Sequence, residues 1–170
     1  MAVVVVGVDG SAQSLEALKL AAREARWRSG QLRAVYVYEP VRPRQAETAA
    51  TVAAAGMWPS AGNRSGELIA DAYRHDDEER EHARRRAEEQ LRRIVTSVGD
   101  DVDGIAVEHV AIGDRHPSEA LLRASTDADL LVVGSRGLGG FGGLLLGSIS
   151  QQCVQHATCP VLVVRPRSAD

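Results

Sequence analysis

Residues 129–148 read DLLVVGSRGLGGFGGLLLGS. The first part, residues 130–133, is continuously apolar, which is typical of a strand buried on both faces of a parallel sheet. Seven glycines then fall within the fourteen positions 134–147. A helix is expected to follow at 148–156. The segment therefore predicts a strand, a glycine-rich loop and a helix in immediate succession.

The same alternation runs through the rest of the chain. The four-valine run at 3–6 predicts a first strand, followed by a helix that Ser11 caps and Ser29-Gly30 ends. Further strands are expected at 32–38, 105–112 and 161–164, and further helices from about 67 or 76 to 98 and from Pro117 onward. Strands that alternate with helices specify a parallel sheet with helices on both faces. Ligands bind such sheets at the carboxyl ends of strands, where the strand order reverses.

Composition is that of an ordinary globular protein and limits the partners of the chain. Its 170 residues fit one domain, and a net charge of −3 without a basic stripe argues against nucleic acid. No apolar run approaches the ~20 residues of a membrane helix, and the apolar start at 1–8 is too short for a signal peptide. We therefore expect a cytoplasmic protein. Cys153 and Cys159 have neither a metal-binding nor a CxxC spacing and are expected to be small core residues.

One segment interrupts the alternation. Residues 39–66 lose the apolar periodicity and are rich in Pro, Gly, Ser, Ala and Thr. We expect a variable, mobile insertion or lid within a single domain of residues 1–170. The charge-dense stretch 76–89 is expected to be the solvated face of the long helix. Its buried face would carry Ala83, Ala87, Leu91, Ile94 and Val98.

The glycine-rich loop has the composition of a phosphate-binding site. Glycine permits positive φ angles and close approach of a ligand to backbone N–H groups, and consecutive N–H groups form anion-binding nests. The helix expected after Gly147 adds unpaired N–H groups and its dipole, while Ser148 adds a hydroxyl and Arg136 a cation. A flexible loop without a ligand is the alternative that glycine content alone leaves open.

Two familiar phosphate-binding motifs do not fit this loop. Gly142-x4-Gly147 followed by Ser148 resembles a Walker A loop, but it lacks the lysine that reaches the β- and γ-phosphates. Gly137-x-Gly139-x-x-Gly142 matches a dinucleotide fingerprint only formally, because it follows the fourth strand and no acidic residue lies about 20 residues further on.

A third pattern fits better. The spacing Gly134-x2-Gly137-x9-Gly147-Ser148 resembles the phosphate loop of ATP-binding universal stress proteins. The stretches VVVVGVDGS at 3–11, DLLVVGS at 129–135 and CPVLVV at 159–164 also resemble segments of that family. Apart from residues 39–66, the likeness covers nearly the whole chain.

The resemblance implies a fold, a ligand and a partner. The fold would be a Rossmann-like α/β domain, with an open five-stranded parallel sheet in the order 3-2-1-4-5 and helices on both faces. The ligand would be ATP or a related adenine nucleotide, with or without Mg²⁺, and its occupancy would control a regulator or sensor in the stress response. The apolar last strand, at 161–164, would lie at a sheet edge and pair with a second copy in a homodimer.

The resemblance also assigns roles to individual residues. Asp9 would meet the base or ribose, the backbone of Val37 the adenine edge, and Gly113 and Gly134 the ribose. The phosphates would be held by Ser135, Arg136, Gly137, Leu138, Gly139, Gly140, Gly147, Ser148 and Ile149. Structural alternatives stay open: Asp9 could cap a helix or order a turn, Val37 could belong to the core, and Gly113 could serve only a turn.

Strong catalytic equipment is not predicted. Asp9 is the one acid expected near the nucleotide, and the sequence holds no HExxH pair, zinc pattern or GxSxG elbow. Fast phosphoryl transfer needs metal and charge clamps that this set does not supply. A binding protein is therefore favoured over a slow ATPase that uses Mg²⁺ and Asp9, and over a ligand-free scaffold. A cyclic nucleotide is a further candidate ligand.

Overall fold

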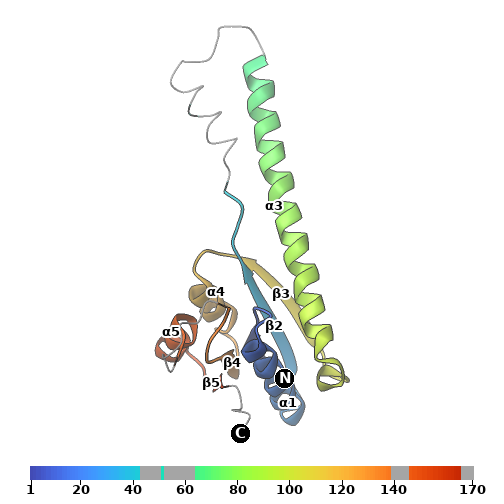
Figure 1. The fold of residues 1–170 in the computed structure, drawn as a ribbon, viewed down its shortest axis with the longest axis vertical. Coiled ribbons are helices and arrows are strands. Elements are labelled where there is room, and N and C mark those ends of the chain that lie inside the picture. Colours follow the sequence, from blue (N-terminus) through green and yellow to red (C-terminus); the bar gives the residue numbers. More distant parts are fainter. Residues whose placement is uncertain (43–50, 52–63, 139–145, 166–170) are drawn as a thin grey trace. The chain divides into compact units, whose positions relative to one another are not determined.

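The computed structural model describes residues 1–42, 51, 64–138 and 146–165. The chain forms two compact units, one of Met1–Tyr38 together with Ala87–Asp170 and the other of Glu39–Arg86. The first unit contains the whole sheet (Figure 1). Most of the expected insertion lies outside the described residues, so its role as a lid within a single domain stays a prediction.

The sheet is entirely parallel and has the order β3-β2-β1-β4-β5, which confirms the predicted fold class. Its strands are β1 (Val3–Gly7), β2 (Gln31–Tyr38), β3 (Val107–Gly113), β4 (Leu130–Gly134) and β5 (Val161–Val164). In the centre, Val5 of β1 lies between Arg33 of β2 and Leu131 of β4. The chain winds outward from β1 to β3 and then returns to the other side of β1, so the strand order reverses between β1 and β4.

Helices cover both faces of this sheet. They are α1 (Ala12–Trp27), the part of α3 (Arg64–Ser97) that belongs to the first unit, α4 (Pro117–Ala124) and α5 (Ser148–His156), with a short 3-10 helix η1 (Gly99–Val102). Val4 and Val6 pack in a core with α1 and the end of α3, whereas Val5 packs in a second core with α4 and α5. No helix in the described ranges is both long and apolar enough to cross a membrane.

Helix α1 begins and ends where the sequence predicts. The N–H of Ser14 donates to Ser11 Oγ at 3.2 Å, which is the geometry of an N-cap. The helix ends at Trp27, and a Cβ on Gly30 would lie 2.4 Å from the carbonyl oxygen of Ala2. Glycine is therefore required where the chain turns back to run beside β1.

Helix α3 is longer than predicted, since it begins at Arg64. Within the second unit, opposite charges three residues apart stabilise it by a few tenths of a kcal/mol each. These pairs are Arg74–Asp71, Arg80–Asp77 and Arg84–Glu81. Asp76 departs from the expected solvated face because it is 1% exposed. Of the expected buried residues, 87, 91, 94 and 98 are buried and 83 is half-buried.

The two cysteines are free thiols. Cys153 is fully buried beside α4 in the second core, and Cys159 is half-buried against the same core. Burial raises the pKa of the Cys153 thiol to about 11. Cys153 therefore acts as a small apolar core residue, as predicted.

A hydrogen-bonded ion-pair network joins β2 and β3 to the connection before β4. Arg33 on β2 donates through Nε to Glu108 on β3 at 2.7 Å, and through Nη1 to Asp127 at 2.7 Å and to the carbonyl oxygen of Ala124 at 3.0 Å. The hydrogen bond to Asp127 and, to a smaller extent, the hydrogen bond to Glu108 raise the pKa of Arg33. Only 17% of the Arg33 side chain is exposed, so its donors depend on these partners.

We expect Arg33→Met to lower the free energy of unfolding by about 1–3 kcal/mol, because charge-assisted hydrogen bonds of a largely buried group are lost. Arg74→Met is the matched control, since Arg74 pairs with Asp71 on an exposed helix surface; it should cost less than about 1 kcal/mol. Urea unfolding followed by circular dichroism measures both. Equal losses in the two variants would contradict the role given to Arg33.

Candidate functional site

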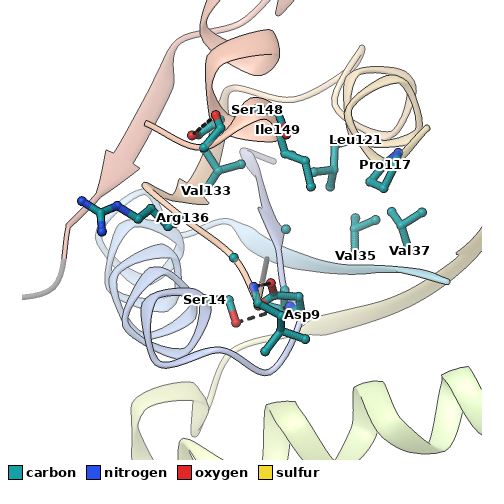
Figure 2. Close-up of a pocket in the computed structure, with 17 residues that line it drawn as sticks. Asp9, Ser14, Val35, Val37, Pro117, Leu121, Val133, Arg136, Ser148 and Ile149 are labelled. Atoms are coloured by element: carbon teal, nitrogen blue, oxygen red, sulfur yellow. Dashed lines mark hydrogen bonds between the residues drawn. The ribbon is translucent and has the colours of Figure 1, made fainter. Parts of the chain in front are cut away.

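A cavity of about 490 Å³ opens in the first unit at the carboxyl ends of β1 and β4 (Figure 2). The strand order reverses between these two strands, which is where open parallel sheets bind ligands. The cavity is lined by Gly7, Val8, Asp9, Ser14, Val35, Val37, Pro117, Leu121, Val133, Gly134, Arg136, Gly137, Leu138, Gly147, Ser148, Ile149 and Ser150. Ends of strands and first turns of helices thus converge on one space.

The cavity has an apolar end and a polar end. The apolar end is formed by the side chains of Val35, Val37, Pro117, Leu121 and Ile149, and Val133 lies beside Ser148. Figure 2 shows Asp9 and Ser14 together on the other side, next to the backbone that leaves β4. An apolar wall beside a few fixed polar groups is the usual make-up of a small-molecule site.

Ser135 anchors the glycine-rich loop from behind the cavity. Its N–H donates to the carbonyl oxygen of Val164 at 2.7 Å, and its own carbonyl accepts the N–H of Gly147 at 2.7 Å. The hydroxyl of Ser150 lies 3.1 Å from the same carbonyl oxygen. Ser135 is 2% exposed. The beginning of the loop and the start of α5 are therefore held together at one residue.

The start of α5 offers backbone donors to the cavity. Gly147 is the N-cap, in an extended conformation, and no side chain caps the helix. The first N–H groups of a helix have no intrahelical partner, and they carry the positive end of the helix dipole. Ser148 and Ile149, which line the cavity, supply two of these groups. The part of the cavity next to the start of α5 is therefore suited to a negative charge.

Asp9 connects the turn after β1 to the glycine-rich loop. Its Oδ1 accepts the N–H of Ser11 at 2.9 Å and its Oδ2 accepts the N–H of Leu138 at 3.0 Å. Its own N–H donates to Ser14 Oγ at 3.3 Å, a contact drawn in Figure 2. Burial acts to raise the pKa of Asp9, but hydrogen bonding from Ser11, Ser14 and Leu138 outweighs it, and the pKa lies below its usual value. The carboxylate is thus charged and ordered.

Most of the residues predicted for the site line the cavity. They are Asp9, Val37, Gly134, Arg136, Gly137, Leu138, Gly147, Ser148 and Ile149. Gly113 does not line the cavity. It packs against the ring of Tyr38, where a Cβ on Gly113 would lie 3.1 Å from Tyr38 Cζ. Ser135 lies behind the wall, and Gly139 and Gly140 fall outside the described residues. Whether these residues bind a ligand stays a prediction.

Sequence reasoning missed most of the apolar end. Val35 could have been found from Val37, since residues two apart share a face of a strand. Leu121 lies one turn after Pro117, so the two share a side of α4. No local pattern reveals that a Cβ on Gly7 would lie 3.0 Å from Leu121 Cδ1. The bare backbone of Gly7 is what lets Leu121 reach the cavity.

Comparisons with known proteins identify the family of the chain. The model of the universal stress protein family matches residues 1–165. The chain belongs to this family. A universal stress protein of Mycolicibacterium smegmatis is 31% identical over 161 residues, which are 95% of this chain and 47% of that protein. The chain spans just under half the length of such curated relatives.

Solved structures of universal stress proteins share the fold. One, described as a complex with cAMP, is 23% identical with a TM-score of 0.54 and is matched over 96% of both chains. Another, from Archaeoglobus fulgidus and described as a complex with dAMP, is 20% identical with a TM-score of 0.55; the match covers 96% of this chain and 98% of that one. At these identities the likeness concerns the fold.

The low pKa of Asp9 predicts an acid-dependent contribution to stability. Because the folded-state pKa lies below the usual value of 3.8, the contribution is present above that value and is lost as the pH falls through the folded-state pKa. Asp9→Asn should destabilise the protein at about pH 6, and the difference should shrink toward about pH 3. Urea unfolding of both proteins across this range measures it. A difference that stays constant with pH would contradict the assignment.

Proposed function

We propose that this universal stress protein domain binds an adenine nucleotide, ATP or a close relative, and acts as a nucleotide-dependent regulator in the stress response. The proposal rests on one cavity that joins an apolar end to an end rich in backbone N–H groups. A nucleobase is suited to the first and phosphates to the second. The neighbours described as complexes with cAMP and dAMP support an adenine nucleotide as the ligand class.

Within this proposal, the base occupies the apolar end, beside the backbone of Val37, and Gly134 lies near the ribose. Asp9 lies at the loop that receives the phosphates. The phosphates lie against the backbone of 136–138 and the first turn of α5, where Ile149 gives its N–H to the ligand and its side chain to the apolar end. Gly113 and Ser135 support the site from outside the lining. Gly139 and Gly140 keep the phosphate role that the family resemblance gives them.

The charges of the cavity favour binding over rapid turnover. Among the described residues that line it, Asp9 is the one acidic residue and Arg136 the one basic residue. Both oxygens of Asp9 already accept backbone N–H groups. Mg²⁺ that accompanies ATP would therefore be held mainly by the phosphates and by water, as is usual for this ion. Slow hydrolysis is the second candidate, and a turnover assay with Mg²⁺ separates it from binding.

Isothermal titration calorimetry with ATP, ADP, AMP and cAMP tests the proposal. Ser148→Pro removes one N–H and the hydroxyl from the start of α5, while proline is well tolerated at the first position of a helix. Gly147, which precedes it, already has the extended conformation that precedes proline. We expect Ser148→Pro to weaken ATP binding by about tenfold or more, because a charge-assisted hydrogen bond is lost.

Ala12→Pro is the matched control. Ala12 occupies the first position of α1 after an extended N-cap, Ser11, and does not line the cavity. It should bind ATP like the unmodified chain. Absence of heat and of a thermal shift with all four nucleotides would reject the proposed function. Equal weakening by both proline variants would reject the role of the α5 start.

We also propose that two copies pair through β5. This strand is an edge of the sheet, and its four residues are all half-exposed. Leu131 N–H donates to the Pro160 carbonyl, and Ser135 N–H donates to the Val164 carbonyl. Since backbone groups alternate along a strand, the N–H groups of Val161 and Val163 face away from β4. The β5 strand of a second copy would accept hydrogen bonds from these N–H groups. The resulting two-fold pairing would cover the β5 edge of each copy.

Val163→Pro removes one of these outward N–H groups, at an edge position where proline is accommodated. Light scattering after size exclusion at micromolar concentration should give a dimer for the unmodified chain and a monomer for the variant. Circular dichroism checks that the variant is folded. A monomeric unmodified chain, or a folded variant that still dimerises, would contradict this pairing.

A further inference from the structure

We propose that Asp9 is the latch that holds the first part of the glycine-rich loop, residues 135–138, in the shape that receives phosphate. The inference rests on the proposed function and gives Asp9 a positioning role in place of contact with the nucleoside. Its carboxylate joins two segments 129 residues apart, through the N–H of Leu138 at 3.0 Å, while its other oxygen accepts the N–H of Ser11 at 2.9 Å. The Leu138 bond crosses from the end of β1 to the loop that leaves β4.

The hydrogen bond between Asp9 and Leu138 requires glycine at position 137. A Cβ on Gly137 would lie 2.5 Å from Asp9 Oδ2, well inside any allowed contact. The loop backbone can therefore reach the carboxylate only if residue 137 has no side chain. The need for glycine at this position follows from Asp9 within the protein itself, without reference to a ligand.

Two fixed points then define the loop between them. The N–H of Ser135 is bound to the Val164 carbonyl and the N–H of Leu138 to Asp9. Between these points, the N–H groups of Arg136 and Gly137 have no hydrogen-bond partner among the residues that the structure describes. Successive free N–H groups held in one place form a nest for an anion. A donor that is fixed in advance does not lose conformational freedom when the ligand binds.

The latch also reduces the conflict between Asp9 and a phosphate. A bare carboxylate at the polar end would repel an anion, but this one is screened by two backbone N–H groups that it accepts. Releasing it would free the loop and expose its charge at the same time. Both effects act on the phosphate part of a nucleotide, and neither acts on the base at the apolar end.

Two experiments on the full chain test the latch, with Asp9→Ala and Gly137→Ala as variants that open it from opposite sides. The first is amide hydrogen exchange by NMR without any ligand. The N–H of Leu138 should exchange about tenfold faster in both variants, because one charge-assisted hydrogen bond is broken. Asp114→Ala is the matched control, since Asp114 also accepts the N–H two residues on, that of His116, but has no hydrogen bond to residues 135–138.

The second experiment compares the binding of ATP and of adenosine by calorimetry. Each latch variant should weaken ATP by about tenfold and leave adenosine unchanged, and the double variant should be no weaker than either single one, because both break the same contact. Equal loss for ATP and adenosine would overturn the latch, since Asp9 would then contact the nucleoside itself. Unchanged exchange at Leu138 in Asp9→Ala would overturn it as well. If the unmodified chain binds neither ligand, the proposed function fails, and the exchange experiment still decides whether Asp9 holds the loop.

Discussion

Strand β1 pairs with β2 on one side and with β4 on the other, and the site depends on the second of these pairings. Val4, Val5 and Val6 are fully buried because both faces of β1 are covered by helices. The chain leaves β1 toward α1 on one face and leaves β4 toward α5 on the other. Two connections that diverge in this way cannot fill the space above the strand ends. The cavity is thus a consequence of strand order, before any side chain is chosen.

Short-range contacts then give this opening its chemistry. The loop after β4 is fixed by buried Ser135 at its base and by Asp9, which accepts the N–H of Leu138. The start of α5 is left without a capping side chain, so its donors face the cavity. On the other side, Leu121 reaches in over Gly7. The site therefore has a polar region made of backbone groups and an apolar region made of side chains. Both lie at the carboxyl ends of β1 and β4.

Much of the fold was predictable because its signals are local. The apolar runs of β1 and β4, the cap at Ser11 and the proline at the start of α4 each mark an element within a few residues. The glycine-rich loop was likewise recognisable from spacing alone, and the residues predicted around it largely line the cavity. These features are set by backbone conformation and by burial on both faces of the sheet, which a sequence records directly.

The parts that escaped prediction depend on contacts between distant segments. The sequence does not say that Gly113 lies under the ring of Tyr38, or that Ser135 is buried behind the loop that it begins. Helix α3 begins earlier than expected, and its stretch 71–84 carries charge pairs between residues three apart, which an apolar periodicity does not record. The hydrogen bond between Asp9 and Leu138 is of the same distant kind. This hydrogen bond depends on the pairing of β1 with β4, because Asp9 follows β1 and Leu138 follows β4.

We have proposed that polyphosphate binds where the chain leaves β1 and β4, against backbone N–H groups. An NMR titration of the ¹⁵N-labelled chain with ATP follows these N–H groups one by one. We expect the amide signals of 136–138 and of Ser148 and Ile149 to shift together and saturate together, while that of Gln31, at the opposite end of the sheet, stays in place. Saturable shifts centred on the amino ends of the strands, with the loop and α5 signals unmoved, would contradict it.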